Sequence, residues 1–440
     1  MNKLKQLWNN LRSSFWFVPS LILAVSIALA MGLVQAHSIA NSQWLARWPY
    51  LFGGSAKGSR EILSTIAGSM MTVVGVTFSM TLVALVLASS QYTSRILRNF
   101  MGDRVTQVVL GVLSGIFAYC LIVLRTIRSG NEGGFVPSLA VFFAMILAMS
   151  GIGFLIFFIH HIAASIQASS IIAEVADETI TAVDLLFPDK IEHEPMDSQE
   201  YQTELPLAGL NWQAVPARRN GYIQSVDNLA LLSLARKHKT VVRMEIGVGH
   251  FVVQNETLAS LTLEGPLEKD IIAALQAVYN IAPHRTVYQD CAFGIRQIVD
   301  MALRALSPGI NDTTTAVMCL NYLTAILARL ASREIPSSHR YEDGELRIIA
   351  IGPTFASLVA ESFDQIRGSA NGNIAIMIQM LDSIQTIASL TASPGRRKVL
   401  LEQSQWITEL AERTIESPHD KTRFDNRLAR ARKAFETEPV

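Results

Sequence analysis

Two arginines and the turn that follows them are the residues of this chain whose types and spacing favour ionic chemistry. Arg296 and Arg304 lie two helical turns apart with Asp300 between them, so the three side chains share one helix face. The next turn ends at Asn311 and Asp312, where a new helix would begin with free backbone N–H groups. Arg296, Arg304, Asn311 and Asp312 are therefore a candidate site for an anion or a partner's carboxylate. The alternative is a rigid, well-capped helix pair at a domain or subunit contact.

Motifs for catalysis, metal binding or cofactor binding do not accompany these residues. The sequence has no nucleophile elbow, no P-loop and no paired carboxylates in a motif. Its three cysteines, Cys120, Cys291 and Cys319, lack metal-ligand spacing and are expected to be reduced and buried. His160 and His161 are adjacent and point to different helix faces, which makes them poor co-ligands of one metal. We predict no enzyme, no cofactor and no metal site.

The composition indicates a membrane protein joined to a polar second half. Half of the residues are hydrophobic and 17% are charged, against about a quarter in soluble proteins. The charge deficit lies in the first 160 residues, and the net charge of zero gives no indication of nucleic-acid binding. A bilayer core needs roughly 20 helical residues. We predict a transmembrane domain over residues 1–161, with spans at about 16–36, 62–88, 107–124 and 136–159.

The first apolar segment has two interpretations. Basic residues precede it, and Val34-Gln35-Ala36 resembles a signal-peptidase site. The apolar run is longer than the core of a usual signal peptide, so we favour an uncleaved anchor. Four spans place both termini on one side of the membrane, and we expect that side to be the cytosol. The prediction is a multi-pass membrane protein with both termini in the cytosol.

The second span lies within residues 62–94, which carry no charge but eleven Ser or Thr residues. Gly68, Thr72, Gly75 and Ser79 alternate at spacings of four and three, which places them on one helical stripe. Such a stripe packs against protein or faces water. The two interpretations are a helix-packing seam and the lining of a pore.

Two further features bear on that choice. Gly111 and Gly115 in the third span are spaced for close helix packing, either inside a four-helix bundle or between copies of a homo-oligomer. The uncharged stretch is longer than a bilayer core, so its end should project toward the cytosol. Arg95 and Arg98 lie just beyond it. They are expected to contact phospholipid headgroups or, alternatively, to form a basic collar at a pore mouth.

The remainder of the chain is predicted to be a cytosolic α+β region. We expect a coupling helix and linker at 162–217, a small β-rich module at 218–265 and a mostly helical domain at 266–440. Residues 249–259 resemble the turn and strand of barrel-sandwich carrier modules, but no lysine occurs between Lys239 and Lys269 to carry a cofactor. In the turn at 307–312, Gly309 is expected to adopt the left-handed conformation, and Asp312 or Thr313 to cap the next helix.

Three phrases of the sequence resemble a known family. They are FWFVPS at 15–20, the run at 64–101 that begins STIAGSMM, and FGIRQIVDMALRALSPGINDTTTAVMC at 293–319. They resemble a bacterial family of predicted membrane proteins, catalogued as domain-of-unknown-function family 2254, over essentially the whole chain. The resemblance implies a bacterial inner-membrane protein. It implies no activity and no catalytic residues.

Two functions fit these observations. The first is an oligomeric, channel-like conduit with a cytosolic regulatory domain, favoured by the polar stripe of the second span. The spans contain no buried acid or base, which argues against proton-coupled transport. The second is a membrane-anchored sensing or scaffolding protein whose cytosolic half binds a ligand or partner. Both place the protein in a lipid bilayer.

Overall fold

The computed structural model describes residues 16–39, 55–91, 103–128, 135–188, 211–263 and 265–436. The chain divides into two compact units, Met1–Ser170 and Ile171–Val440, and each is treated by itself. Arg95 and Arg98, the predicted basic collar, lie outside the described residues.

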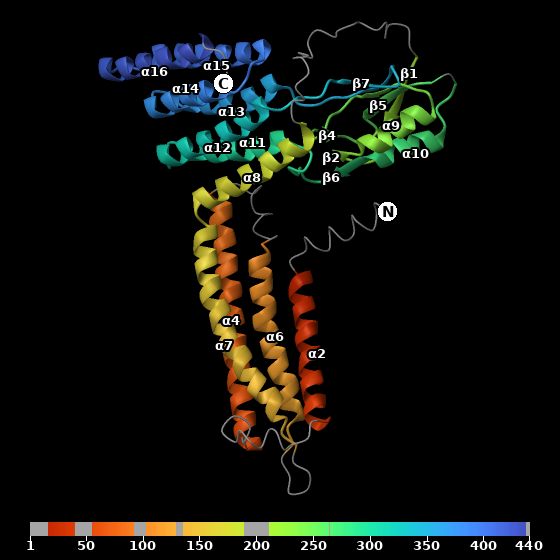
Figure 1. Ribbon diagram of the computed structural model, residues 1–440, viewed down its shortest axis with the longest axis vertical. Helices are drawn as coiled ribbons and strands as arrows, with labels where there is room; N and C mark the ends of the chain where they lie inside the picture. The colour runs from red at the N-terminus through yellow and green to blue at the C-terminus, as the bar shows by residue number, and fades with distance from the viewer. Residues whose placement is uncertain are drawn as a thin grey trace. The chain divides into compact units, whose positions relative to one another are not determined.

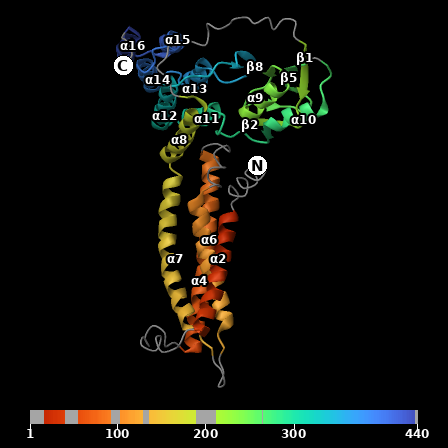
Figure 2. The same cartoon turned by 45° about the vertical axis from the view of Figure 1, so that its right-hand side comes forward.

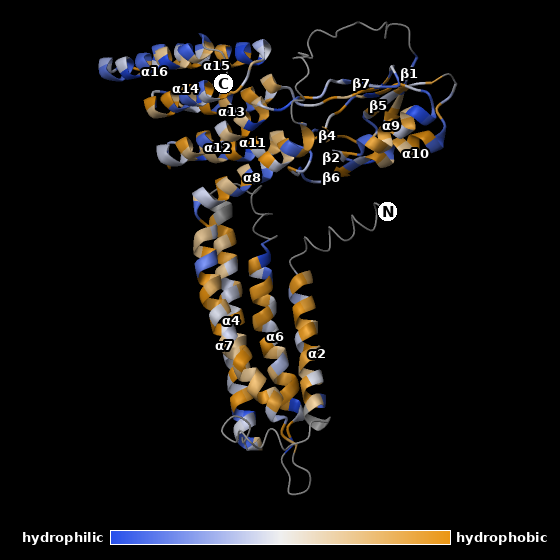
Figure 3. Ribbon diagram, viewed as in Figure 1, coloured by the Kyte–Doolittle hydropathy of each residue, from blue (hydrophilic) through white to orange (hydrophobic). Residues whose placement is uncertain are grey.

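In the first unit, the described residues form four long helices that run side by side in two views (Figures 1 and 2). They are α2 (Phe17–Ile39), α4 (Ala56–Gln91), α6 (Arg104–Thr126) and α7 (Ser138–Ser165). Each contains most or all of one predicted span, and their residues are mainly apolar (Figure 3). The longest, α4, has 36 residues and is about 54 Å long at 1.5 Å per residue.

Helix α6 packs against α2, α4 and α7, so it lies at the centre of the bundle. The predicted packing pair faces α2. A Cβ atom built at Gly111 would lie 3.0 Å from the Cα of Pro19, and one at Gly115 would clash with the Ser26 hydroxyl. The backbones approach closely because neither glycine has a side chain. Gly111 and Gly115, which were predicted to serve helix packing, therefore lie where α6 approaches α2 closely.

Helix α4 turns one face toward this centre. Its buried residues recur at spacings of three, four and seven, as the seam of a packed helix does. They are Ser59, Leu63, Ala67, Met70, Thr77 and Ala84. Gly151 of α7 lies close to Met70, with 3.4 Å between a built Cβ and the sulfur. The hydroxyl of Thr77 donates to the Val73 carbonyl at 2.8 Å, so this buried polar group is satisfied within its own helix.

Among the described residues, five helices are long and apolar enough to cross a membrane, one more than predicted. The fifth is α12 (Thr313–Ala331), whose mean hydropathy of 1.3 is well below the 2.2–2.5 of the other four. It packs against α11, α13 and α14 of the second unit. Its last turn carries Arg329, which pairs with Asp184 at 2.6 Å.

The second unit contains a group of helices and a β-containing part (Figure 1). The helices are α8 (Ala168–Leu186), α9 (Asn228–Lys237), α10 (Lys269–Val278), α11 (Cys291–Ala305), α12, α13 (Phe355–Ser369), α14 (Ile374–Ser389), α15 (Pro394–Thr414) and α16 (Pro418–Glu436). Side-chain caps fix several starts: Asp290 accepts from the Phe293 amide, and Asn373 from the Ile376 amide. The cysteines Cys291 and Cys319 are buried and unpaired, as predicted.

Two sheets form the β-containing part. A five-stranded sheet has the order β1-β5-β3-β8-β7, and a three-stranded sheet has the order β4-β2-β6. The strands are β1 (Trp212–Pro216), β2 (Gly221–Val226), β3 (Val242–Met244), β4 (Phe251–Val252), β5 (Thr257–Thr262), β6 (Tyr279–Ala282), β7 (His339–Glu342) and β8 (Glu345–Ile349). Strands from outside 218–265 thus join both sheets, and the predicted barrel-sandwich arrangement is not confirmed.

The turn between α11 and α12 differs from the prediction in one residue. Asn311, not Gly309, has a positive φ, of 49°. Asparagine tolerates this left-handed conformation better than most residues. The turn closes as the amides of Asn311 and Asp312 donate to the carbonyls of Ser307 and Ala305. Asp312 then caps α12 by accepting from the Thr315 amide at 3.0 Å, as predicted.

The close approach of α6 to α2 can be tested with two matched glycine-to-alanine substitutions. Gly115→Ala forces a methyl group against Ser26 and should lower stability by about 1–3 kcal/mol. Gly153→Ala adds the same methyl group to α7 where nothing lies within 4 Å, and it should be neutral or slightly stabilising. Thermal unfolding of both variants in one detergent is the measurement. Equal melting temperatures would contradict the packing described here.

The left-handed residue of the turn can be tested in the same way. Asn311 is exposed, so Asn311→Val changes mainly the backbone preference and should destabilise by about 1–2 kcal/mol. Asn311→Gly and Gly309→Ala should each change stability by less than about 1 kcal/mol. Denaturant unfolding would compare the three variants. A larger loss of stability for Gly309→Ala than for Asn311→Val would indicate that Gly309, and not Asn311, adopts the left-handed conformation.

Candidate functional site

The predicted stripe of α4 lies on the side of the helix that faces away from its own bundle. At 3.6 residues per turn, Gly68, Thr72, Gly75 and Ser79 fall roughly opposite the buried seam of Leu63, Ala67 and Met70. All four stripe residues are exposed. Apart from the adjoining backbone of α4 itself, no atom of the described residues lies within 4 Å of a Cβ built at Gly68 or Gly75. Within the described bundle, the stripe is therefore not used to pack helices of the same chain.

Large apolar side chains flank the stripe and make it a shallow groove. Met71 and Phe78 lie on one side, and Val76 and Val83 on the other, all at least 48% exposed. The hydroxyl of Thr72 donates to the Gly68 carbonyl at 3.2 Å, so it needs no water or partner to be satisfied. A helix with a narrow surface could enter such a groove and approach the α4 backbone closely.

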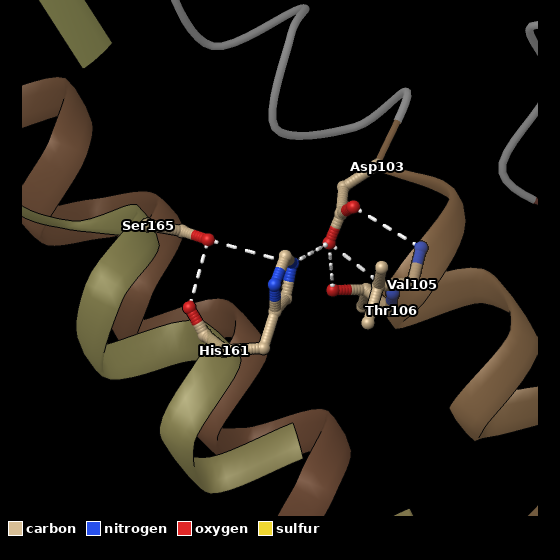
Figure 4. Close-up of polar contacts among 5 residues, drawn as sticks. All are labelled: Asp103, Val105, Thr106, His161 and Ser165. Atoms are coloured by element: carbon tan, nitrogen blue, oxygen red, sulfur yellow. Dashed lines mark hydrogen bonds and ion pairs between the residues drawn. The ribbon is translucent and has the colours of Figure 1, made fainter. Parts of the chain in front are cut away.

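A polar cluster joins α6 to the end of α7 in the same unit (Figure 4). Asp103 caps α6 by accepting from the amides of Val105 and Thr106, both at 3.1 Å. Its Oδ2 also lies 2.8 Å from Nε2 of His161. A carboxylate can only accept, so the imidazole supplies the proton of this bond. The neighbouring His160 is exposed, in keeping with the prediction that the two histidines point to different faces.

The cluster contains Ser, His and Asp but is not a catalytic triad. In a triad, Asp and Ser bind opposite ring nitrogens, so that the ring can take the serine proton. Here Ser165 Oγ lies 3.4 Å from the same Nε2 that contacts Asp103. The serine hydroxyl donates instead to the His161 carbonyl at 2.8 Å. The arrangement is suited to holding two helix ends together.

The pKa of Asp103 lies below its ordinary value of 3.8. Partial burial alone would raise this pKa, but hydrogen bonds from Thr106 and His161, with the charge of His161, outweigh burial and lower it. The carboxylate is therefore ionised over the physiological range. Because its pKa is depressed in the folded state, its contribution to stability is present above about pH 3.8 and is lost as the pH falls through the lower folded pKa.

The predicted ionic residues of the second unit are engaged within the chain. The guanidinium of Arg296 pairs with Asp300 at 3.1 Å and with Glu361 of α13 at 3.0 Å. Asp312 contacts its own helix through Thr315. The contacts of Arg296 and Asp312 thus lie in different parts of the fold. Arg304 lies in the last turn of α11, and Asn311 serves the turn through its backbone.

The pairing of Asp103 with His161 was not predicted from the sequence. Asp103 precedes the third predicted span and His161 follows the fourth, 58 residues later. The recognisable signal is local: an aspartate three residues before Thr106 has the spacing of a helix cap. What sequence alone does not supply is the antiparallel packing of α6 and α7 that brings the two ends together.

Two substitutions separate the cap of α6 from its link to α7. Asp103→Asn retains a good cap but removes the charge, whereas Asp103→Ala removes both and should destabilise by about 1 kcal/mol more. The difference in melting temperature between wild type and Asp103→Asn should shrink as the pH falls below about 4, where the Asp103 carboxylate becomes protonated. A difference that grows below pH 4 would contradict an ionised, stabilising Asp103.

Comparisons with known proteins concern the whole chain. A family model described as "Predicted membrane protein (DUF2254)" matches residues 12–386. The uncharacterised proteins Mb1321c of Mycobacterium bovis and Rv1290c of Mycobacterium tuberculosis are each 31% identical over 444 residues, which cover 99% of this chain and 83% of the relative. No solved structure matches. The match over most of the chain confirms the resemblance noted in the sequence: the protein belongs to the DUF2254 family of predicted membrane proteins.

Proposed function

We propose that this protein is a multi-pass protein of the bacterial inner membrane whose copies assemble through α4 into a channel-like conduit. Helices α2, α4, α6 and α7 cross the bilayer in this proposal. Helix α12 stays with the second unit, because it is the least apolar of the five candidates and packs among α11, α13 and α14. Both termini and the second unit lie in the cytosol, where the second unit regulates the conduit.

The observation that carries the proposal is the outward direction of the α4 stripe. A lipid-facing helix gains nothing from a row of small residues, since lipid chains pack equally well on large apolar side chains. A second helix gains from them, because close backbone approach increases van der Waals contact. The open groove over Gly68 and Gly75 is therefore assigned to another copy of this chain.

Polarity favours a conduit over a simple packing contact. Thr72 and Ser79 bring hydroxyl groups to the stripe, and no charged residue occurs from Ile62 to Ser94. If several copies form a ring with their stripes around a central pore, the hydroxyl groups of Thr72 and Ser79 would contact the water in that pore. The length of α4, about 54 Å against a bilayer core of about 30 Å, lets it extend beyond the membrane. Lacking buried acids or bases, the conduit would be passive.

Cross-linking tests the assembly. Thr72→Cys, on the exposed stripe, should form disulfide-linked dimers on oxidation in membranes. Ala67→Cys, on the buried seam of the same helix, should not. The native cysteines are buried, so they should add little background. If Ala67→Cys forms cross-links and Thr72→Cys does not, the buried seam of α4, and not the exposed stripe, lies in the contact between copies, which would contradict the proposal.

Conduction is tested in planar bilayers. Gly75→Leu fills the groove of α4 and should reduce the conductance of the wild-type protein. Gly153→Leu adds the same side chain at an open position of α7 and should leave it unchanged. Equal currents from both variants would show that the α4 stripe does not line the conduit. Copies that cross-link but carry no current would favour the alternative, a membrane-anchored scaffolding or sensing protein.

A further inference from the structure

An open cleft lies at the end of the bundle where α4 begins and α6 ends. Its volume is about 380 Å³, and it is lined by Arg60, Glu61, Ser64 and Thr65 of α4 and by Leu124 of α6. A cation, an anion, two hydroxyl groups and one apolar side chain thus meet in one small space. Neither the family description nor the relatives assign a role to it.

The position of the cleft along the helices is that of a membrane boundary. Arg60 and Glu61 are the last charged residues of α4 before the uncharged run that starts at Ile62. On the antiparallel α6, Leu124 is followed at once by Arg125. Charged residues mark the level at which a spanning helix leaves the hydrocarbon. The cleft therefore lies at the depth of phospholipid headgroups.

No ion pair joins the two charged side chains that line the cleft. One guanidinium nitrogen of Arg60 donates to the Ile127 carbonyl at 2.7 Å, which fixes the side chain toward the end of α6. Its remaining N–H groups can bind a phosphate. Within the described residues, no hydrogen bond or ion pair engages the Glu61 carboxylate, although Arg60 is its neighbour in sequence and Lys57 lies one turn away. The Glu61 side chain is exposed beside a fixed cation.

We propose that this cleft binds the headgroup of an aminophospholipid of the phosphatidylethanolamine type. The phosphodiester pairs with Arg60, and the primary ammonium donates to Glu61. Ser64 supplies a hydroxyl group to the phosphate, and Leu124 contacts the glycerol end. The Thr65 hydroxyl donates to the Glu61 carbonyl at 2.8 Å and lines the cleft without donating to the phosphate. A choline headgroup fits less well, because its quaternary ammonium has no N–H to donate. A purely anionic headgroup meets the repulsion of Glu61. The proposal does not depend on whether copies of the chain assemble.

The test uses the full-length protein, stripped of lipid in detergent and mixed with equal amounts of dioleoyl phosphatidylethanolamine, phosphatidylcholine and phosphatidylglycerol. Native mass spectrometry counts the bound lipids. The wild type should retain about fivefold more phosphatidylethanolamine than either competitor, as one exposed ion pair would give. Glu61→Gln should abolish the preference over phosphatidylcholine. Among the described residues the Glu61 carboxylate has no partner, so the fold should be unaffected, which a melting curve checks.

Two controls complete the experiment. Arg125→Gln removes a cation at the same end of α6 but outside the cleft, and it should keep the wild-type preference. Soluble glycerophosphoethanolamine carries the same charges without acyl chains and should not displace the lipid at millimolar concentration. Equal retention of the three lipids, a preference that survives Glu61→Gln, or displacement by the soluble compound would each overturn the proposal.

Discussion

The close packing of α6 against α2 determines how the rest of the first unit is arranged. Because Gly111 and Gly115 let the two backbones approach, α6 becomes the central helix and its other faces are free for α4 and α7. Polar contacts then fix those neighbours at α6 or its ends. The hydroxyl of Tyr119 donates to the Ala140 carbonyl of α7 at 2.9 Å, Arg60 of α4 reaches Ile127, and Asp103 holds His161 of α7.

This arrangement leaves α4 with a used and an unused face. The used face is the seam of Leu63, Ala67 and Met70, which meets the core around α6. The unused face carries Gly68, Thr72, Gly75 and Ser79. A row of small residues with nothing packed on it is the feature of the bundle that one chain by itself leaves unexplained. The proposed assembly through this face would account for the residue types and for their spacing.

The sequence predicted local features well and long-range ones poorly. Helix starts followed from caps such as Asp227 and Asp312. The direction in which the α4 stripe faces did not follow from the sequence. Periodicity identifies the faces of a helix, but it does not show which face meets the neighbouring helices. The pairing of strands distant in sequence was not predicted either. Strand β3 pairs in parallel with β8, and no local sequence pattern specifies that contact.

The ionic residues of the second unit illustrate the same limit. The spacing of Arg296 and Asp300 correctly indicated an ion pair along α11, but Glu361 comes from α13, 65 residues away, and occupies the same guanidinium. Arg296, which the sequence suggested as part of a site for an external anion, instead links α11 to α13. These contacts stabilise the fold of the second unit.

The central claim is that the outer face of α4 meets another copy of the chain. Electron cryomicroscopy of the protein in lipid nanodiscs tests it most directly, because it shows the number of copies and the environment of each helix. The account predicts a ring in which Gly68 and Gly75 of each copy lie against a neighbouring copy, around a central axis. A monomer in which that face of α4 contacts lipid would contradict it.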